Sequence, residues 1–170
     1  MSVELLFLQF SVDKLRQLAG RIEFCLEKLN EDQIWARGGQ HENAIGNLAL
    51  HLTGNVRQWI VSTLGNSHFN RDRDSEFAAR EGVTATELSA NLLDTVEQAT
   101  QVISGLNTAQ LTQMYEVQNY RVSGVEAVYH VVEHFAEHTG QIIFATKKLT
   151  GEDLGFYQHL SNAAHLEKVP

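Results

Sequence analysis

Histidine is the residue type whose spacing in this sequence points most directly to chemistry. His130, His134 and His138 recur four residues apart. On a helix, such residues lie one above the other, roughly 6 Å apart along the axis, so two neutral imidazoles can reach one metal ion at about 2.1 Å. The third ligand must come from another segment, and His51, in the middle of a second helical pattern, is the best candidate.

The apolar pattern around these histidines indicates which of them face the interior. When the segment from 123 to 150 is projected at about 100° per residue, its apolar side chains fall in one sector. His138 lies near the centre of that sector, His134 a little off it, and His130 at its edge. We therefore predict that His51, His134 and His138 bind a divalent metal ion and that His130 lies just outside the ligand set. A single interior histidine is more often a hydrogen-bonded core residue, so the prediction depends on the set of three.

Two other metal chemistries fit the same helix less well. The segments 130–134 and 134–138 both read His-x-x-Glu-His, a zinc peptidase motif in which the glutamate is the general base. Glu133 and Glu137 project roughly 160° and 120° from the apolar sector, so both should face solvent. A di-iron carboxylate bundle needs Glu-x-x-His on two helices, and no histidine of this sequence has an acid three residues before it.

Four long segments carry the apolar spacing of helices, at about 3–29, 43–64, 84–104 and 123–150. Thr84 is a plausible N-cap, Ser123-x-x-Glu126 has the form of a capping box, and Gly151 follows the last helix. The only proline is the final residue, so none interrupts a helix. We predict an all-α, four-helix-bundle domain over residues 1–170, with long connections between helices 2 and 3 and between helices 3 and 4. The second connection is expected to be extended from Met114 to Tyr120.

Composition restricts the partners and the compartment. The 170 residues hold 13 Lys and Arg against 21 Asp and Glu, a net charge of −8, which disfavours nucleic acid and anionic membrane surfaces. No apolar run reaches the roughly 18 residues of a membrane span, and the first residues carry Glu4 where a secretion signal would be basic. The single cysteine, Cys25, cannot form an internal disulfide. We therefore expect a cytoplasmic protein.

Two motifs resemble one known family. His51-Leu-x-Gly54-Asn55-x-x-x-Trp59 and His134-x-x-x-His138-x-Gly-Gln141-Ile are similar to the metal-dependent four-helix bundles of the DinB/YfiT-like superfamily. The resemblance covers about 5–149, and the charged loop 70–77 is similar to one uncharacterised branch. It implies that His51, His134 and His138 bind a divalent metal, and that the protein is a homodimer. Many members have arginine where this sequence has Thr139, so a role for that arginine does not carry over.

Several residues are candidates for substrate binding by their positions. Asn55, Trp59 and Gln141 lie one or two turns from the histidines and are expected to line the mouth of the site. Another reading of Asn55 and Gln141 is that they orient the ligand imidazoles. Three loop residues, Arg71, Arg73 and Glu76, could grip a polar cofactor; a solvated charged turn is the alternative for them, and core packing is the alternative for Trp59.

A three-histidine site leaves coordination positions open, which is typical of catalytic metal sites. The resemblance includes thiol S-transferases that use bacillithiol or mycothiol, and a mycothiol-dependent isomerase. We therefore expect a metal-dependent transferase of the thiol S-transferase type, or a hydrolase, acting on a small molecule. The cofactors would be Zn, Ni or Fe and a low-molecular-weight thiol. The alternative is a non-catalytic metal-binding or stress-related bundle protein.

Overall fold

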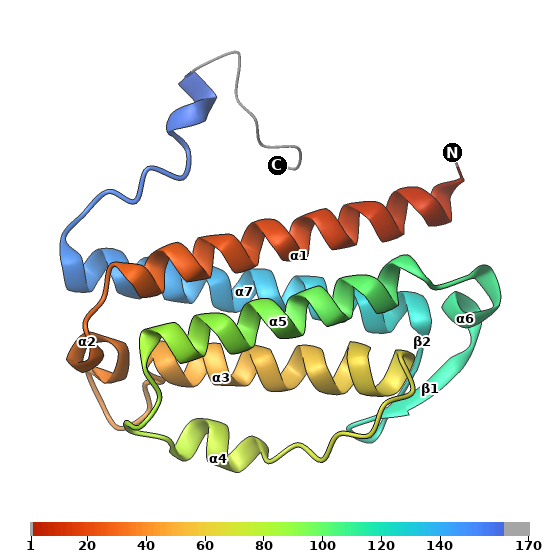
Figure 1. Ribbon diagram of the computed structural model, residues 1–170, viewed down its shortest axis with the longest axis horizontal. Helices are drawn as coiled ribbons and strands as arrows, with labels where there is room; N and C mark the ends of the chain where they lie inside the picture. Colours follow the sequence, from red (N-terminus) through yellow and green to blue (C-terminus); the bar gives the residue numbers. More distant parts are fainter. Residues whose placement is uncertain (1, 162–170) are drawn as a thin grey trace.

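The computed structural model describes residues 2–161, and helices make up most of it (Figure 1). In chain order the elements are α1 (Val3–Glu27), α2 (Glu31–Trp35), α3 (Ile45–Val56), the π-helix η1 (Arg57–Leu64), α4 (Arg73–Ala78), α5 (Ala85–Ser104), α6 (Thr108–Thr112), β1 (Met114–Val117), β2 (Tyr120–Ser123), α7 (Gly124–Thr150) and the 3-10 turn η2 (Gln158–Ser161).

Four long rods form the body of the molecule: α1, α3 with its continuation η1, α5 and α7. The α1 helix packs against α5 and α7, and α3 packs against the same two helices (Figure 1). Their apolar faces meet in one core whose largest fully buried side chains include Leu15, Ile22, Leu52, Leu92 and Phe135. The predicted all-α four-helix bundle is confirmed. Among residues 2–161, no helix has the length and apolar character needed to cross a membrane.

The ends of the long helices follow the capping residues of the sequence. The Thr84 hydroxyl accepts a hydrogen bond from the Glu87 amide at 3.3 Å, and Ser123 does the same for Glu126 at 3.3 Å. Gly151 ends α7 in the left-handed conformation, with φ of 71°, which glycine adopts without steric cost. These local signals fix the start and the end of the helix that carries His134 and His138.

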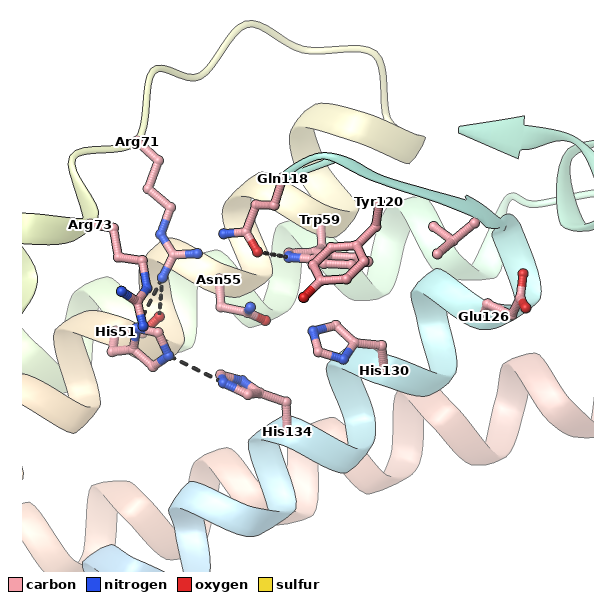
Figure 2. A pocket seen from close by; sticks show the side chains of 11 residues that line it. His51, Asn55, Trp59, Arg71, Arg73, Gln118, Tyr120, Glu126, His130 and His134 are labelled. Atoms are coloured by element: carbon pink, nitrogen blue, oxygen red, sulfur yellow. Dashed lines mark hydrogen bonds between the residues drawn. The ribbon is translucent and has the colours of Figure 1, made fainter. Parts of the chain in front are cut away.

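The second rod changes its winding after Val56. Sequence periodicity predicts a continuous helix over 43–64, whereas the structure has α3 from Ile45 to Val56 and then the π-helix η1. The Gly65 amide accordingly bonds to the carbonyl five residues before it, on Ile60, at 2.9 Å. Wide turns of this kind are rare and frequently lie at functional sites. Here the wide turns carry Trp59 toward the region of the histidines (Figure 2), and Gln58 contacts Arg71 there.

Short elements occupy the long connections. The connection between η1 and α5 contains α4, which lies along α3, and the connection between α5 and α7 contains α6 and an antiparallel β1–β2 hairpin (Figure 1). Gln118 and Asn119 form the hairpin turn with φ of 50° and 66°. The predicted extended segment is therefore a hairpin. Helices α2, α4 and α6 were not expected; side chains of Asn30, Asp72 and Asn107 cap them.

Candidate metal centre

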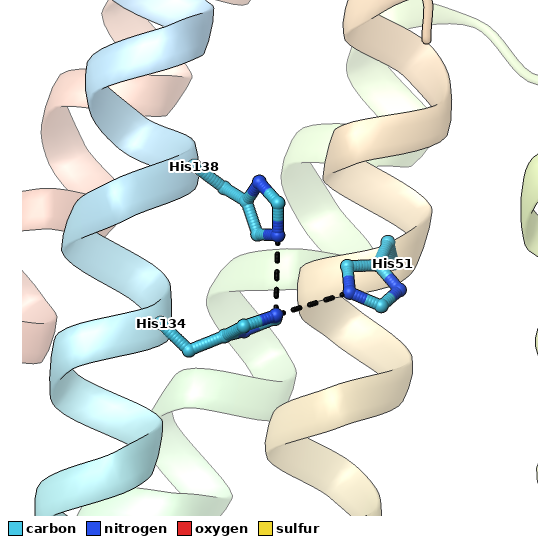
Figure 3. A group of neighbouring side chains, drawn as sticks. All are labelled: His51, His134 and His138. Carbon is cyan, nitrogen blue, oxygen red and sulfur yellow. Dashed lines mark hydrogen bonds between the residues drawn. The ribbon is translucent and has the colours of Figure 1, made fainter. Parts of the chain in front are cut away.

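The three predicted ligand histidines meet between two rods of the bundle. His51 projects from α3, and His134 and His138 project from successive turns of α7 (Figure 3). The Nε2 atom of His134 lies 3.1 Å from Nε2 of His51 and 3.1 Å from Nε2 of His138. One ligand nitrogen from each residue lies within 4.8 Å of the others. His51 is buried, and the other two are half-buried.

This spacing fits a shared metal ion. Imidazole nitrogens about 2.1 Å from one ion, in tetrahedral or octahedral arrangement, are roughly 3.0–3.4 Å apart. The two measured Nε2–Nε2 distances of 3.1 Å fall in this range. The three histidines could therefore hold a metal ion; that they do so stays a prediction.

Hydrogen bonds behind the rings present the correct nitrogens to such an ion. Nδ1 of His51 lies 3.1 Å from Oε2 of Glu76, and Nδ1 of His138 lies 2.7 Å from Oε1 of Gln141. Because these oxygens accept the Nδ1 protons, the Nε2 atoms of both rings keep their lone pairs and face His134. Lone pairs directed at one point suit a cation.

His134 differs from its two neighbours. Its Nδ1 atom is buried and finds no hydrogen-bond partner in the part of the chain that the structure describes. Burial, together with the nearby imidazoles of His138 and His51, lowers the pKa of His134 to about 3. Burial also lowers the pKa of His51, although its contact with Glu76 works in the opposite direction. At neutral pH both rings are therefore in the neutral state that binds metals.

A buried ion pair holds Glu76 against His51. Arg71 donates from Nε to Oε1 and from Nη2 to Oε2 of Glu76, both at 2.7 Å, and from Nη1 to Oε1 of Gln58 at 3.1 Å. Burial raises the pKa of the Glu76 carboxyl, but the hydrogen bonds from Arg71 and His51 outweigh it and leave that pKa below its usual value. Glu76 is therefore a carboxylate that orients His51, in the arrangement that is common behind metal-binding histidines.

Gly54 makes room for this pair on the surface of α3. A Cβ atom at this position would lie 1.9 Å from Oε1 of Glu76 and 2.9 Å from Nε of Arg71. The glycine of the His51-x-x-Gly54 motif thus has a steric reason: the carboxylate and the guanidinium lie directly against the helix backbone, one turn after His51.

The short α4 helix, which carries Glu76, is itself anchored to α3. The fully buried Asn47 amide donates to the carbonyl oxygens of Glu76 at 2.8 Å and Ala79 at 2.9 Å. Arg37 donates to Oδ1 of Asn47 at 2.5 Å and to the carbonyls of Phe77 and Ala79 at 3.2 Å. These bonds tie the C-terminal half of α4 to Arg37 and to Asn47 at the start of α3, and so fix the carboxylate behind His51.

A cavity of about 420 Å³ adjoins the histidines (Figure 2). His51 and His134 form one end of it, and Trp59, Tyr120 and His130 form an aromatic wall. The Trp59 and His130 ring centroids are 4.2 Å apart. The cavity is open enough and large enough for a small organic molecule, since ligand sites typically measure about 300–1,000 Å³.

The other predicted site residues lie in different places around this cavity. Asn55, Trp59 and Arg73 line it; that they bind a substrate stays a prediction. His130, expected just outside the ligand set, lines it as well and lies 5.5 Å from His134 between ring centroids.

Three placements differ from the sequence-based prediction. Glu76 is buried against α3, and both of its carboxylate oxygens accept hydrogen bonds from Arg71 or His51. It therefore orients a histidine and does not reach into the cavity. Arg71 borders the cavity, but its guanidinium donates to Glu76, to Gln58 and to the backbone carbonyl oxygen of His51. Gln141 faces a separate cavity beside Phe144, and it accepts a hydrogen bond from His138, which fits the alternative that it orients a ligand imidazole.

The hairpin supplies the site residues that sequence reasoning missed. Gln118 accepts a hydrogen bond from Nε1 of Trp59 at 3.3 Å and donates to Oε1 of Gln58 at 2.8 Å. Tyr120, two residues later, forms part of the aromatic wall (Figure 2). The weak alternation of 114–120 indicated an extended segment, but the sequence gives no signal for how the hairpin folds back over η1.

Solved structures place the fold in the DinB-like class. A conserved protein from Enterococcus faecalis matches with a TM-score of 0.70 at 14% identity, over 89% of this chain and 99% of its own. A DinB-like protein from Bacillus subtilis matches with a TM-score of 0.66 at 16% identity, over 86% of this chain and 96% of its own. Identities this low establish a common fold and nothing about activity.

Family membership follows from the sequence itself. Residues 2–163 match the family described as "Protein of unknown function (DUF1572)", and the chain belongs to this family, which has a DinB-like fold. None of the curated proteins matches the sequence.

Proposed function

We propose that this protein is a metal-dependent enzyme acting on a small molecule, a transferase of the thiol S-transferase type or a hydrolase. The observation that supports the proposal is the cavity of about 420 Å³ that ends on His51 and His134. A purely structural metal site is normally closed by protein ligands, whereas a catalytic site keeps a position open toward substrate. The cavity supplies such an opening.

The residues around the site have separable roles in this proposal. When bound, a divalent ion on three imidazoles makes a coordinated thiol or water a nucleophile at neutral pH. Glu76 and Gln141 keep the Nδ1 protons of His51 and His138 in place, which directs both Nε2 atoms inward. Trp59 and Tyr120 form the aromatic side of the cavity, against which an apolar part of a substrate could lie.

A thiol used in the reaction would come from outside the chain. Cys25 is fully buried in the core on α1, and burial raises the pKa of its thiol above the usual value. Both features make Cys25 inert. This supports a low-molecular-weight thiol as the second cofactor of a transferase.

The alternative is a non-catalytic metal-binding bundle. The two possibilities differ in turnover. Zinc-loaded protein would be assayed with cysteine and 1-chloro-2,4-dinitrobenzene for thiol transfer, and with p-nitrophenyl acetate for hydrolysis. We expect turnover in one assay that is lost on chelation and in His134→Ala, and retained in the exposed-site control His68→Ala. Zinc binding without turnover in a wider panel of electrophiles would favour the non-catalytic alternative.

We also propose a homodimer. Val3, Leu6 and Phe10 recur along one face of α1 and are 81%, 53% and 47% exposed, an apolar stripe that a second copy could cover. Sedimentation equilibrium should give twice the chain mass, and Phe10→Glu should shift the protein toward the monomer. A monomer in the unmodified protein would contradict this proposal.

A further inference from the structure

The side-chain oxygen of Asn55 is an unpaired polar atom beside the cavity. Asn55 lies one turn after His51 on α3 and is 3% exposed. Its Oδ1 atom is buried and has no hydrogen-bond partner within residues 2–161, although the side chain faces the cavity (Figure 2). An unpaired buried amide oxygen is energetically costly, so a ligand that supplies a donor here recovers that cost.

One cation at the cavity is also free to bind a ligand. The guanidinium of Arg73 lies 4.8 Å from the Phe77 ring centroid, and within the described chain it forms no hydrogen bond or ion pair. Arg71, beside it, is neutralised by Glu76. The exposed Arg73, flanked in the sequence by Asp72 and Asp74, thus presents a guanidinium without a direct ion-pair partner near the histidine end of the cavity. A planar guanidinium of this kind suits a carboxylate.

The opposite end of the cavity is aromatic and bears a negative charge. Trp59 and Tyr120 have ring centroids 6.2 Å apart, and Val122 lies beside them. Glu126, at the same end, already accepts hydrogen bonds from the Ser123 amide and hydroxyl, both at 2.7 Å. This end therefore suits a flat apolar group and disfavours a second anion.

We propose that the cavity binds a small aromatic carboxylate with a polar group between its two ends. The carboxylate lies toward Arg73 and the histidines, the flat ring lies against Trp59 and Tyr120, and a central amide or hydroxyl bonds to Asn55. This inference rests on the proposed function for its reaction, because it names the class of substrate of that same site. The proposed recognition of the ligand rests on Asn55, Arg73 and the aromatic wall.

Hippurate (N-benzoylglycine) is a probe with all three features. Three analogues each lack one of them: hippuramide lacks the charge, N-acetylglycine lacks the ring, and 4-phenylbutanoate replaces the central amide by methylene groups. Binding to zinc-loaded protein would be measured by isothermal titration calorimetry. We expect hippurate to bind about tenfold or more tightly than each analogue, since each contact removed is worth roughly that factor. Equal binding of any analogue, or no binding of hippurate, would overturn the proposal.

Variants assign the contacts to residues. Arg73→Gln should weaken hippurate about tenfold and leave hippuramide unchanged, whereas Arg121→Gln, the same charge change on an exposed hairpin residue, should affect neither. Asn55→Leu should abolish the preference for hippurate over 4-phenylbutanoate. Tyr120→Ala should weaken hippurate, and the exposed α7 residue Tyr129 serves as its control in Tyr129→Ala. Unchanged hippurate binding in Arg73→Gln would contradict the proposed orientation.

The same experiment separates this inference from the proposed function. Metal content is measured first, and hippurate is titrated into zinc-loaded and chelator-stripped protein. Zinc binding without hippurate binding would refute the ligand class and leave the metal site standing. Hippurate binding that depends on Arg73 and Asn55 in a protein that holds no zinc would support the ligand class and refute the metal-dependent reaction.

Discussion

Oε2 of Glu76 lies 3.1 Å from Nδ1 of His51, and this contact joins two segments 25 residues apart. The carboxylate is simultaneously bound by Arg71, so it remains charged inside the protein. It thereby fixes which His51 nitrogen carries the proton and turns Nε2 toward His134. Metal-binding histidines commonly have such a carboxylate partner.

Removing the charge of Glu76 should weaken metal binding. Glu76→Gln keeps the size of the side chain, but it loses the carboxylate that holds the Nδ1 proton of His51 and leaves Arg71 without its counter-charge. We expect zinc affinity to fall about 10- to 100-fold in a chelator competition assay. Glu137→Gln, on the exposed side of α7, is the matched control and should leave the affinity unchanged. Equal affinities of Glu76→Gln and the unmodified protein would refute the orienting role.

Adding a methyl group at Gly54 should disturb the same contact between Glu76 and His51. In Gly54→Ala the new Cβ would overlap Oε1 of Glu76, so the ion pair must move. We expect a loss of about 1–3 kcal/mol in the free energy of unfolding and weaker zinc binding. Gly140→Ala places its Cβ in open space on α7 and should be neutral or stabilising by up to about 1 kcal/mol. Both variants would be measured by urea unfolding and by zinc titration. Equal losses in Gly54→Ala and Gly140→Ala would show that the effect does not come from the overlap with Glu76.

The metal-free protein should lose stability as the pH falls below about 6.5. In the folded chain the pKa of His134 is about 3 and that of His51 is lowered, whereas in the unfolded chain histidine takes up a proton near 6.5. Between these values the unfolded state binds more protons, so stability rises with pH and is lost on acidification. Glu76, whose folded pKa is also lowered, acts in the same direction below about 4.5.

Urea unfolding of chelator-stripped protein at pH 7 and pH 5 measures this dependence. His134→Gln should reduce the difference between the two pH values, because one strongly shifted histidine is gone. His68→Gln, at an exposed position, should retain it. A stability that does not change between pH 7 and pH 5 would show that the folded histidines titrate normally.

The fold could be predicted from the sequence because its determinants are local. Apolar spacing gave the four long helices, and Thr84, Ser123 and Gly151 marked three of their ends. The π-helical turns of η1 could not be predicted, because they depend on hydrogen bonds that shift by one residue without a change in apolar pattern. The short helices are stabilised by capping and by anchors such as Asn47, which is distant in sequence from α4.

The candidate site was predictable where its residues lie on long helices. His134 and His138 lie one turn apart on the interior face of α7, and His51 lies on the interior face of α3. In a four-helix bundle these faces meet, so the three side chains could be expected to lie close together. The roles of Arg71, Glu76 and Gln141 depend on how a connection folds back or on which side of a ring a neighbour lies. Both features are set by tertiary contacts. The sequence could therefore place these side chains near the site but could not identify their hydrogen-bond partners.

The most direct test of the account is the metal content of the protein, purified without an affinity tag for metals and measured by inductively coupled plasma mass spectrometry. The account predicts about one divalent ion per chain, loss of that ion in His134→Ala and its retention in His68→Ala. Protein that is metal-free after growth with zinc, nickel and iron, and that takes up none of them on titration, would contradict it.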